Sequence, residues 1–266
     1  MTKDPLDILE RLTAGNVSKD LARIIAFCLS DGTVSRRKAN KGESFTVMFF
    51  NKDKKLHEIF NRSIENIFNI KPKILPNKRC LSSIVHSKNV VLTLIRISNS
   101  FRTKACNSFP VCPVWSRKAR EGSCFICKPI SINGTPFPAI SLDWLEKARE
   151  ESVVEFFKVL FSCDRGVSIW ISNGKTRREV MLGCAHPVLL DKFKEKLENL
   201  LKVKIGKKDK GLRINSLEAI KRFRDKIGFI EGCVAERGKF KGIEKNILLN
   251  HAILGSLPAG RKPCES

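Results

Sequence analysis

Two acidic residues, Asp31 and Asp164, each follow an apolar stretch typical of a helix, and they lie 133 positions apart. An acidic residue at the carboxyl end of a helix opposes the helix macrodipole, so it is unfavourable there unless a positive charge compensates it. A divalent cation supplies that charge, and Mg²⁺ binds one or two protein carboxylates together with phosphate oxygens and water. The pair therefore predicts a metal site suited to phosphodiester hydrolysis. The alternative is that both residues merely end their helices.

The surroundings of the two aspartates are similar in sequence. Residues 31–71 placed over residues 164–204 without a gap give eleven identities in 41 positions, whereas unrelated segments would give roughly two or three. The identical pairs are Asp31/Asp164, Val34/Val167, Ser35/Ser168, Asn40/Asn173, Val47/Val180, Met48/Met181, Leu56/Leu189, Phe60/Phe193, Glu65/Glu198, Asn66/Asn199 and Lys71/Lys204. Two copies in one chain predict two halves related by a pseudo-twofold axis, with both aspartates near that axis.

The hydrophobic pattern predicts the elements that position each aspartate. The first copy is expected to contain a helix over 21–30, strands over 33–38 and 44–51, a helix over 53–68, a strand over 89–97 and a closing helix from Ser98 or Ser100. The second copy is expected to contain a helix over 151–163, strands over 167–172 and 178–183, a helix from Pro187, a strand over 212–215 and a helix to about residue 227. We expect each half to follow the order αββαββα, of which this pattern leaves one strand unlocated; the arrangement is α+β.

These elements divide the chain into four parts. We expect an N-terminal half over 1–108, a linker over 109–140, a C-terminal half over 141–228 and a basic extension over 229–266. Five prolines between positions 110 and 138 predict little regular structure in the linker. The sequence of the extension indicates no definite structure.

The chain carries a net charge of +23 at pH 7, spread over both halves. Such a field attracts polyanions, so nucleic acid is the favoured partner. An anionic membrane surface is the alternative, but no basic face lies opposite a long apolar helix face. No run of about 18 apolar residues predicts a membrane span. The first residues lack the layout of a secretion signal, so we expect an intracellular, cytoplasmic protein.

Ten cysteines without a secretion signal indicate reduced thiols. Cys106, Cys112, Cys124 and Cys127 include one C-x₂-C motif, and four such thiolates can bind one tetrahedral Zn²⁺. The first two of them are separated by five residues, and no second C-x₂-C motif is present. Free thiols are therefore favoured over a structural zinc site.

The segments IIAFCLSDG (24–32) and FKVLFSCDRG (157–166) resemble the two signature motifs of single-chain LAGLIDADG homing endonucleases. The resemblance extends over about residues 18–228 and occurs twice. It implies pseudo-twofold αββαββα halves whose antiparallel four-stranded sheets form a DNA-binding saddle, with the LAGLIDADG helices at the interface. It also implies a monomer, encoded in an intron or intein of a prokaryotic or organellar host. Such a protein cuts both strands of a long pseudo-palindromic site with Mg²⁺ or Mn²⁺.

The resemblance also implies roles for single residues. The last acidic residue of each motif is a metal ligand, which corresponds to Asp31 and Asp164. A basic catalytic position on the last strand is matched approximately by Arg96 and Arg213. Arg165 departs from the usual Asp-Gly ending, and it is placed to pair with Asp164 or with a phosphate.

A second departure concerns the end of the second strand. The family tends to place a polar or basic residue there to order water, and Asn51 and Lys52 match this catalytic position in the first half. Cys184 and Ala185 stand at the same offset in the second half and do not match it. The two strands of DNA are therefore expected to be cut at unequal rates.

Strand side chains that face away from the helices are expected to contact double-stranded DNA. Arg and Lys read guanine edges in the major groove, and phosphate contacts add salt-sensitive affinity. The candidates are Arg36, Arg37, Lys38, Lys41, Ser44, Thr46, Ser168, Trp170, Lys175, Arg177 and Arg178, with Lys78, Arg79, Lys208 and Lys210 as phosphate contacts. For any one of them, a solvated charge at a sheet edge is the alternative.

Three functions fit these patterns. A site-specific DNA endonuclease is favoured. An intron maturase or a catalytically weak DNA-binding relative would use the same saddle, with intron RNA as a further partner. A DNA-binding transcription factor is disfavoured by the paired aspartates.

Overall fold

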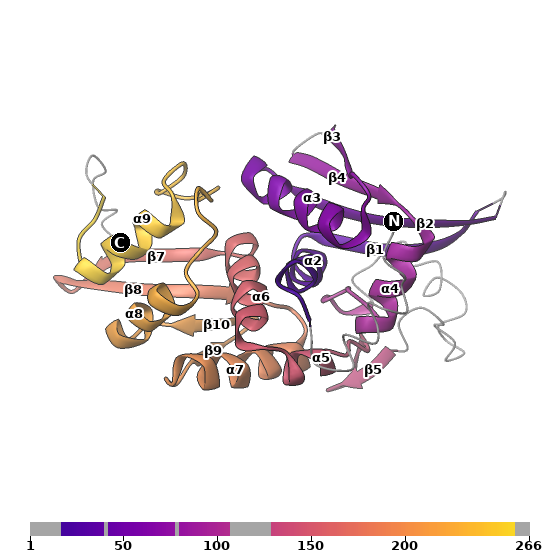
Figure 1. The fold of residues 1–266 in the computed structure, drawn as a ribbon. Coiled ribbons are helices and arrows are strands. Elements are labelled where there is room, and N and C mark those ends of the chain that lie inside the picture. Colours follow the sequence, from indigo (N-terminus) through magenta and orange to yellow (C-terminus); the bar gives the residue numbers. More distant parts are fainter. Residues whose placement is uncertain (1–16, 40–41, 78–79, 107–128, 259–266) are drawn as a thin grey trace.

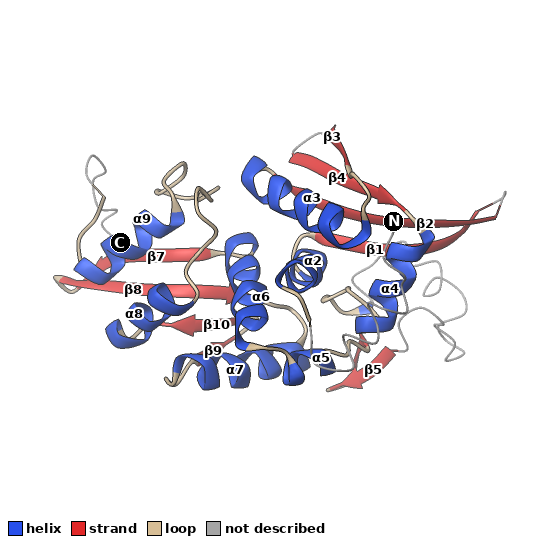
Figure 2. Ribbon diagram, in the orientation of Figure 1, coloured by secondary structure: helices blue, strands red, loops and turns tan. Residues whose placement is uncertain are grey.

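The computed structural model describes residues 17–39, 42–77, 80–106 and 129–258. Two antiparallel four-stranded sheets lie on either side of two central helices, and further helices pack on each sheet (Figures 1 and 2). The protein is therefore a mixed α+β structure, as the sequence predicts. Among the described residues, no helix combines the length and apolar character that a membrane span requires.

The first sheet belongs to a run of seven elements in the order αββαββα. These are α2 (Lys19–Leu29), β1 (Gly32–Ala39), β2 (Gly42–Asn51), α3 (Lys54–Phe68), β3 (Lys73–Asn77), β4 (Cys80–His86) and α4 (Lys88–Ser98). The strands are arranged β1-β2-β4-β3. Ser18 begins α2 by accepting a hydrogen bond from the Leu21 amide, which is the N-cap role expected of serine.

The second sheet belongs to a run of the same order. Its elements are α6 (Glu150–Cys163), β7 (Gly166–Ser172), β8 (Lys175–Gly183), α7 (Pro187–Leu201), β9 (Gly206–Lys208), β10 (Gly211–Ile214) and α8 (Leu217–Lys226). The strands are arranged β7-β8-β10-β9, which matches the first sheet. The registers also correspond, since Val34 pairs with Val47 and Val167 pairs with Val180.

One predicted strand is wrong. Residues 89–97 were expected to form a strand because they are rich in β-branched residues, but they lie in α4. Ser87 caps this helix, and Val90, Val91, Leu94 and Ile97 recur at helical spacing on its buried face. The pattern missed β3 and β4 in this half, and it missed β9 in the second half.

The linker and the extension also differ from their predictions. Between the halves, β5 (Pro129–Ile132) and β6 (Thr135–Pro138) form a hairpin, and α5 (Asp143–Lys147) follows it. Asn133 and Gly134 make the turn with positive φ angles of 49° and 75°. The extension contains α9 (Lys245–Leu254), which packs on β7 beside α8. Both segments therefore contain more regular structure than we expected.

The two central helices hold the halves together. α2 and α6 lie side by side in the middle of the molecule (Figure 1). Ala26 and Val159 are fully buried, and one core cluster includes residues of both halves. At the amino-terminal side, Arg23 of α2 donates a 2.8 Å hydrogen bond to Glu155 of α6. This packing brings the carboxyl ends of α2 and α6 together.

Candidate catalytic centre and nucleic-acid surface

The carboxyl ends of α2 and α6 carry the two aspartates. Asp31 follows Ser30, the C-cap of α2, and Asp164 is itself the C-cap of α6. Burial raises the pKa of Asp164 to about 7, and the negative charge of Asp31 adds to this increase. Burial likewise raises the pKa of Asp31. The structure therefore places two partly buried carboxylates within electrostatic reach of each other, as the repeat predicts.

Asp31 has a specific partner at the end of β2. Asn51 donates a 2.9 Å hydrogen bond from Nδ2 to Asp31 Oδ2, which opposes the effect of burial on the pKa of Asp31. The Asp53 amide donates to Asn51 Oδ1 at 2.9 Å, so the orientation of the Asn51 amide is fixed. Lys52 is exposed in the bend that follows. The structure thus brings Asn51, but not the Lys52 side chain, into contact with Asp31.

The corresponding position in the second half holds Cys184. Its pKa is raised to about 12, mainly by burial, and the charge of Asp164 contributes to the increase. The Cys184 thiol donates to the carbonyl of His186 at 3.7 Å. Among the described residues, no side-chain amide donates to Asp164. The two carboxylates therefore have different surroundings.

Lys245 is a site residue that the sequence pattern did not indicate. Its Nζ donates to the carbonyls of Ser162 at 2.6 Å and Arg165 at 2.9 Å, beside Asp164. Its positive charge opposes the effect of burial on the pKa values of both aspartates. In the sequence, Lys245 is one of many lysines and lies about 80 residues beyond the second motif. No local pattern distinguishes it from the others.

The two aspartates fit a divalent metal ion of the Mg²⁺ type, which needs only one or two protein carboxylates when phosphate oxygens and water complete its coordination. No cluster of three or more His, Cys, Asp or Glu side chains suited to a metal occurs among the described residues. Zinc receives no support. Cys106 is buried, and Cys112, Cys124 and Cys127 lie outside the described residues.

The second sheet has one face covered by helices and one open face. Val180 and Leu182 are buried against the helices, so their neighbours along β8 point to the opposite side. Through the strand register, the predicted residues that share this open face are Ser168, Trp170, Lys175, Arg177, Lys208 and Arg213. Lys210 is exposed in the turn between β9 and β10. The open face therefore gathers most of the basic residues predicted for this half.

Arg178 does not belong to the open face. It pairs in register with Ile169, which is buried beneath α9. Its Nη1 donates to the carbonyls of Ala252 at 2.7 Å and Ile253 at 3.1 Å. The prediction that Arg178 contacts DNA is therefore wrong in its geometry, because this guanidinium caps the carboxyl end of α9.

Two other predicted arginines also lie elsewhere. Arg36 pairs with Glu43 at 2.7 Å and lies over the ring of Phe45, which packs against the core. It thus belongs to the helix-covered side of the first sheet. Arg96 was expected on the last strand, but it is exposed on α4. Its placement on a strand equivalent to that of Arg213 is therefore wrong.

The open face of the first sheet is less basic in its described part. Ser44 is exposed, and Thr46 is buried with its Oγ1 3.2 Å from His86 Nδ1. The side chains of Arg37 and Lys38, and residues Lys41, Lys78 and Arg79, lie outside the described part of the structure. Their predicted contacts with DNA remain predictions.

The arginine that departs from the family motif lies over the open face of the second sheet. Arg165 has a left-handed backbone with φ of 68°, and its Nη1 is 4.0 Å from Met181 Sδ. Arg165 also lines a small hollow together with Lys208, Lys210 and Arg213. The charge of Arg165 lowers the pKa of Asp164, although burial dominates. Arg165 therefore lies between the carboxylate and the basic surface.

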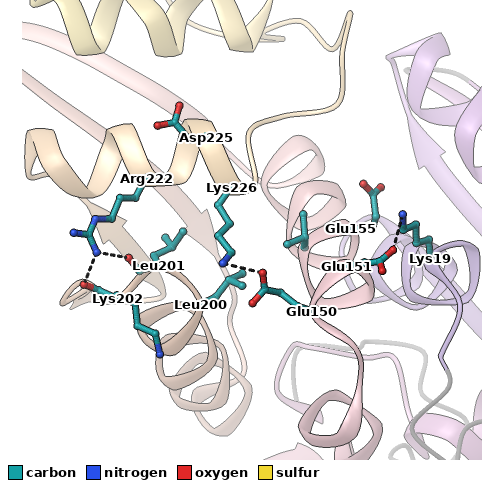
Figure 3. Close-up of a pocket in the computed structure, with 11 residues that line it drawn as sticks. Lys19, Glu150, Glu151, Glu155, Leu200, Leu201, Lys202, Arg222, Asp225 and Lys226 are labelled. Atoms are coloured by element: carbon teal, nitrogen blue, oxygen red, sulfur yellow. Dashed lines mark hydrogen bonds and ion pairs between the residues drawn. The ribbon is translucent and has the colours of Figure 1, made fainter.

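A larger hollow of about 670 Å³ lies at the opposite end of α6 (Figure 3). Two ion pairs join charged side chains of its lining, Lys226 with Glu150 and Lys19 with Glu151, each at 2.8 Å. Glu150 and Glu151 are in the first turn of α6, whereas Asp164 caps its last turn. A helix of this length spans roughly 20 Å, so this hollow is separate from the aspartates.

Comparison with known proteins identifies similar folds. No family model and no curated protein matches the sequence. The structure of I-DmoI in complex with DNA and Ca aligns with a TM-score of 0.50 and 14% identity, over 88% of this chain and 97% of that chain. Mesophilic variants of the homing endonuclease I-DmoI align with a TM-score of 0.49 and 14% identity, over 79% and 95%. The meganuclease I-SmaMI bound to uncleavable DNA aligns with a TM-score of 0.46 and 14% identity, over 81% and 87%. The chain has the fold of the LAGLIDADG homing endonucleases.

Proposed function

We propose that this protein is a site-specific endonuclease that cuts both strands of DNA with the help of a divalent metal ion, Mg²⁺ or Mn²⁺. The observation that carries the proposal is the meeting of Asp31 and Asp164 at the carboxyl ends of α2 and α6. Two carboxylates brought together in a partly buried position repel each other, which is unfavourable unless a cation joins them. The charge of +23 supports a polyanionic substrate.

The open faces of the two sheets would bind the duplex. On the second sheet, Arg177 and Lys175 are exposed next to Trp170, so cationic and aromatic groups are available for base edges and phosphates. Lys208 and Lys210 would contact phosphates beside the centre. The similar strand order of the two sheets supports an internal repeat that binds a pseudo-palindromic site as a monomer.

Asp31 and Asp164 would hold the metal ion. A divalent cation bound there would supply Lewis acidity and would neutralise charge on the phosphodiester. Asn51 would keep the Asp31 carboxylate oriented through its 2.9 Å hydrogen bond. Arg213, held 3.2 Å from Glu179 on the open face, would direct positive charge towards the DNA backbone.

Similar solved structures support the choice of substrate. The structure of I-DmoI with a TM-score of 0.50 is described as a complex with DNA and Ca. For this chain, we extend the proposal to an intron- or intein-encoded protein of a prokaryotic or organellar host that acts in the cytoplasm or its organellar equivalent. We also propose the units 1–108 and 141–228 as the two halves, with 109–140 as linker and 229–266 as extension.

The test is cleavage of a duplex library that includes intron-insertion sites, with Mg²⁺ and with EDTA. Wild-type protein should make double-strand cuts that need the metal ion. Asp31→Asn and Asp164→Asn should each reduce cutting by about a hundredfold or more, because a metal ion contributes several kcal/mol to such a reaction. Both variants should still bind the selected duplex in EDTA. Metal-independent cutting, or cutting that neither substitution affects, would contradict the proposal.

A second function is favoured by one observation, the presence of Cys184 where the first half has Asn51. If the second centre is weak, the protein would act as an intron maturase or as a DNA-binding relative with little cleavage. Such a protein would bind the library tightly without cutting it. Intron RNA that binds with comparable affinity, together with a faster splicing rate, would then identify a maturase.

A further inference from the structure

The C-terminal extension crosses the junction between the two halves. The Ile230 amide donates to Ser162 Oγ at 2.9 Å in α6. Four residues later, the Val234 amide donates to Asp53 Oδ2 at 3.1 Å, at the start of α3 in the first half. The Lys245 amide then donates back to the Cys233 carbonyl at 2.8 Å. This segment, residues 230–245, therefore contacts both halves before α9 begins.

Lys245 is the buried end of this segment. Its side chain is almost entirely removed from solvent, with 5% of the residue exposed. Burial of an ammonium group is costly unless its donors find acceptors. Two acceptors are supplied by the carbonyls of Ser162 and Arg165, at 2.6 Å and 2.9 Å, and the ring of Phe229 lies 5.8 Å from Nζ. The carboxyl end of α6 is also the negative end of its dipole, which favours a cation there.

The two carbonyls lie on either side of Asp164 in the sequence. Ser162 is in the last turn of α6, and Arg165 follows the aspartate with a positive φ of 68°. Gly166 comes next, and a Cβ there would lie 3.5 Å from Lys245 Cε. The ammonium therefore joins both ends of the turn that presents the Asp164 carboxylate. The aliphatic part of the lysine side chain packs against the start of β7.

In the first half, a side chain holds the carboxylate of the aspartate itself rather than the turn that carries it. There, Asn51 reaches from β2 to the carboxylate of Asp31 itself. In the second half the corresponding residue is Cys184, which donates to a backbone carbonyl instead. The second half thus has no equivalent of Asn51. It has Lys245 instead, which binds the backbone beside Asp164 rather than the carboxylate.

We propose that Lys245 is a positioning residue for the centre, supplied by the C-terminal extension to hold the turn of Asp164. This inference rests on the proposed nuclease function. The ammonium of Lys245, which contacts the residues on both sides of Asp164, also places a positive charge beside the two aspartates and so offsets part of their mutual repulsion. The catalytic centre is thus built from three parts of the chain rather than from two repeats.

The experiment compares Lys245→Met, which keeps an unbranched apolar side chain as far as Cε and removes the charged nitrogen, with Lys245→Arg, which keeps the charge. Lys221→Met, on the exposed side of α8, is the matched control. The first measurement is amide hydrogen exchange of the metal-free protein. Exchange within 162–168 should become about tenfold faster in Lys245→Met. The segment 29–35 around Asp31 should stay within about twofold of wild type.

The second measurement is the rate at which each DNA strand is cut with Mg²⁺. Lys245→Met should slow at least one strand by about tenfold, as removal of a group that orients a ligand does. It should bind the duplex in EDTA as wild type does. Lys245→Arg should show smaller changes in both measurements. If Lys245→Met does not fold, the Arg variant still tests the inference, because the larger, planar guanidinium cannot occupy the buried position of the Lys245 ammonium without shifting the two carbonyls.

Unchanged exchange in 162–168 in both variants would overturn the inference. Faster exchange with unchanged cutting of both strands would overturn the positioning role. If wild-type protein cuts no duplex while exchange responds as expected, the nuclease proposal fails. Lys245 would then stabilise the turn at Asp164 without a catalytic role. The two failures are therefore distinguishable.

Discussion

Asn51 donates a hydrogen bond to the carboxylate of Asp31, and the residue at the corresponding position of the second half, Cys184, makes no such bond to Asp164. The two halves share strand order and register but differ at the point where chemistry would occur. This contact contributes to the difference in pKa between the two carboxylates, and the charge of Asp31, which raises the pKa of Asp164, contributes as well. Burial acts on both carboxylates, but Asn51 opposes its effect only at Asp31, whereas the pKa of Asp164 reaches about 7.

Replacement of Asn51 should weaken the first centre. In Asn51→Leu the carboxylate of Asp31 loses its orienting donor, so we expect at least one strand to be cut about 10-fold to 100-fold more slowly. Cutting should be measured strand by strand on an end-labelled duplex with Mg²⁺. Cys184→Ala is the control, and it should change either rate by less than about twofold, since the thiol makes no bond to Asp164. Equal rates in wild type and Asn51→Leu would show that the amide has no role in cutting.

Arg178 and Arg177 are adjacent residues with opposite expected effects. Arg178→Ala should lower the free energy of unfolding by about 1–3 kcal/mol, because two carbonyls at the end of α9 lose a charged donor. Arg177→Ala should change stability by less than about 0.5 kcal/mol, because its side chain is exposed. Chemical denaturation measures both values.

When DNA affinity is measured instead of stability, the Arg177 variant should show the larger change and the Arg178 variant the smaller one. Arg177→Ala should weaken binding and reduce the slope of log affinity against log salt concentration by about 1, whereas Arg178→Ala should leave the slope unchanged. A loss of affinity confined to Arg178→Ala would contradict the assignment of the open face.

Two buried histidines should make stability depend on pH. Nε2 of His57 and of His186 each faces a carbonyl, that of Asn51 at 3.0 Å and that of Pro138 at 2.9 Å. Nε2 therefore donates, and Nδ1 accepts from Ser83 and from the Leu189 amide, respectively. Protonation of Nδ1 would break the bond from the Leu189 amide to His186, and at His57 it would force Ser83 Oγ to accept instead of donate. Burial also lowers the pKa of both histidines, although the carbonyls act in the opposite direction.

The direction in which stability changes with pH follows from the difference in proton binding between the folded and the unfolded protein. The unfolded chain takes up protons as pH falls below about 6.5, whereas the folded protein does not until a lower pH. The stability that the two histidines contribute should therefore be constant above this value and should fall as the pH is lowered through their folded pKa values. The raised pKa values of Asp31 and Asp164 act in the opposite direction, because these carboxyls take up protons in the folded protein first. Thermal unfolding between pH 7.5 and 5 tests this, with metal absent, in a protein that carries Asp31→Asn and Asp164→Asn so that the two aspartates do not titrate. His57→Gln should reduce the slope, and a melting temperature that rises on acidification over this range would contradict the assignment.

The contact between the central helices gives a further prediction. Although burial raises the pKa of Glu155, hydrogen bonds from Lys158 and Arg23 lower it below its ordinary value. The folded protein therefore gains stability from this carboxylate above about pH 4.5, and loses it as the pH falls further. Glu155→Gln should destabilise the protein by about 1–3 kcal/mol near neutral pH. Glu146→Gln, whose ion pair with Lys196 is more exposed at 3.6 Å, should have little effect.

The sequence predicted the repeat, most of the elements and the pair of aspartates because these depend on local patterns. The position of Asn51 could also be predicted, since it depends on strand length within the repeat. The strand proposed over 89–97 was wrong because β-branched residues fit both a strand and a buried helix, and Ser87 as N-cap decided between them. β3 was missed because Pro76 interrupts its pattern, which is tolerated on an edge strand.

The side of the sheet on which a residue lies was harder to predict than the sheet itself. Successive residues of a strand point to opposite faces, so an error of one position exchanges Arg177 and Arg178. Contacts made across large separations were not predictable at all. The bonds from Lys245 to Ser162 and Arg165 join residues about 80 positions apart, and only the packing of α9 on β7 brings them together.

Lys245 follows both aspartates in the sequence, which affects what a growing polypeptide can do. The ribosome makes both sheets, both aspartates and the basic open faces before it makes this lysine, and domains begin to fold as they emerge. A nascent chain would therefore be able to bind DNA before Lys245 contacts the turn at Asp164. Under the proposed function, synthesis of α9 would therefore complete the catalytic centre after the DNA-binding surface has formed.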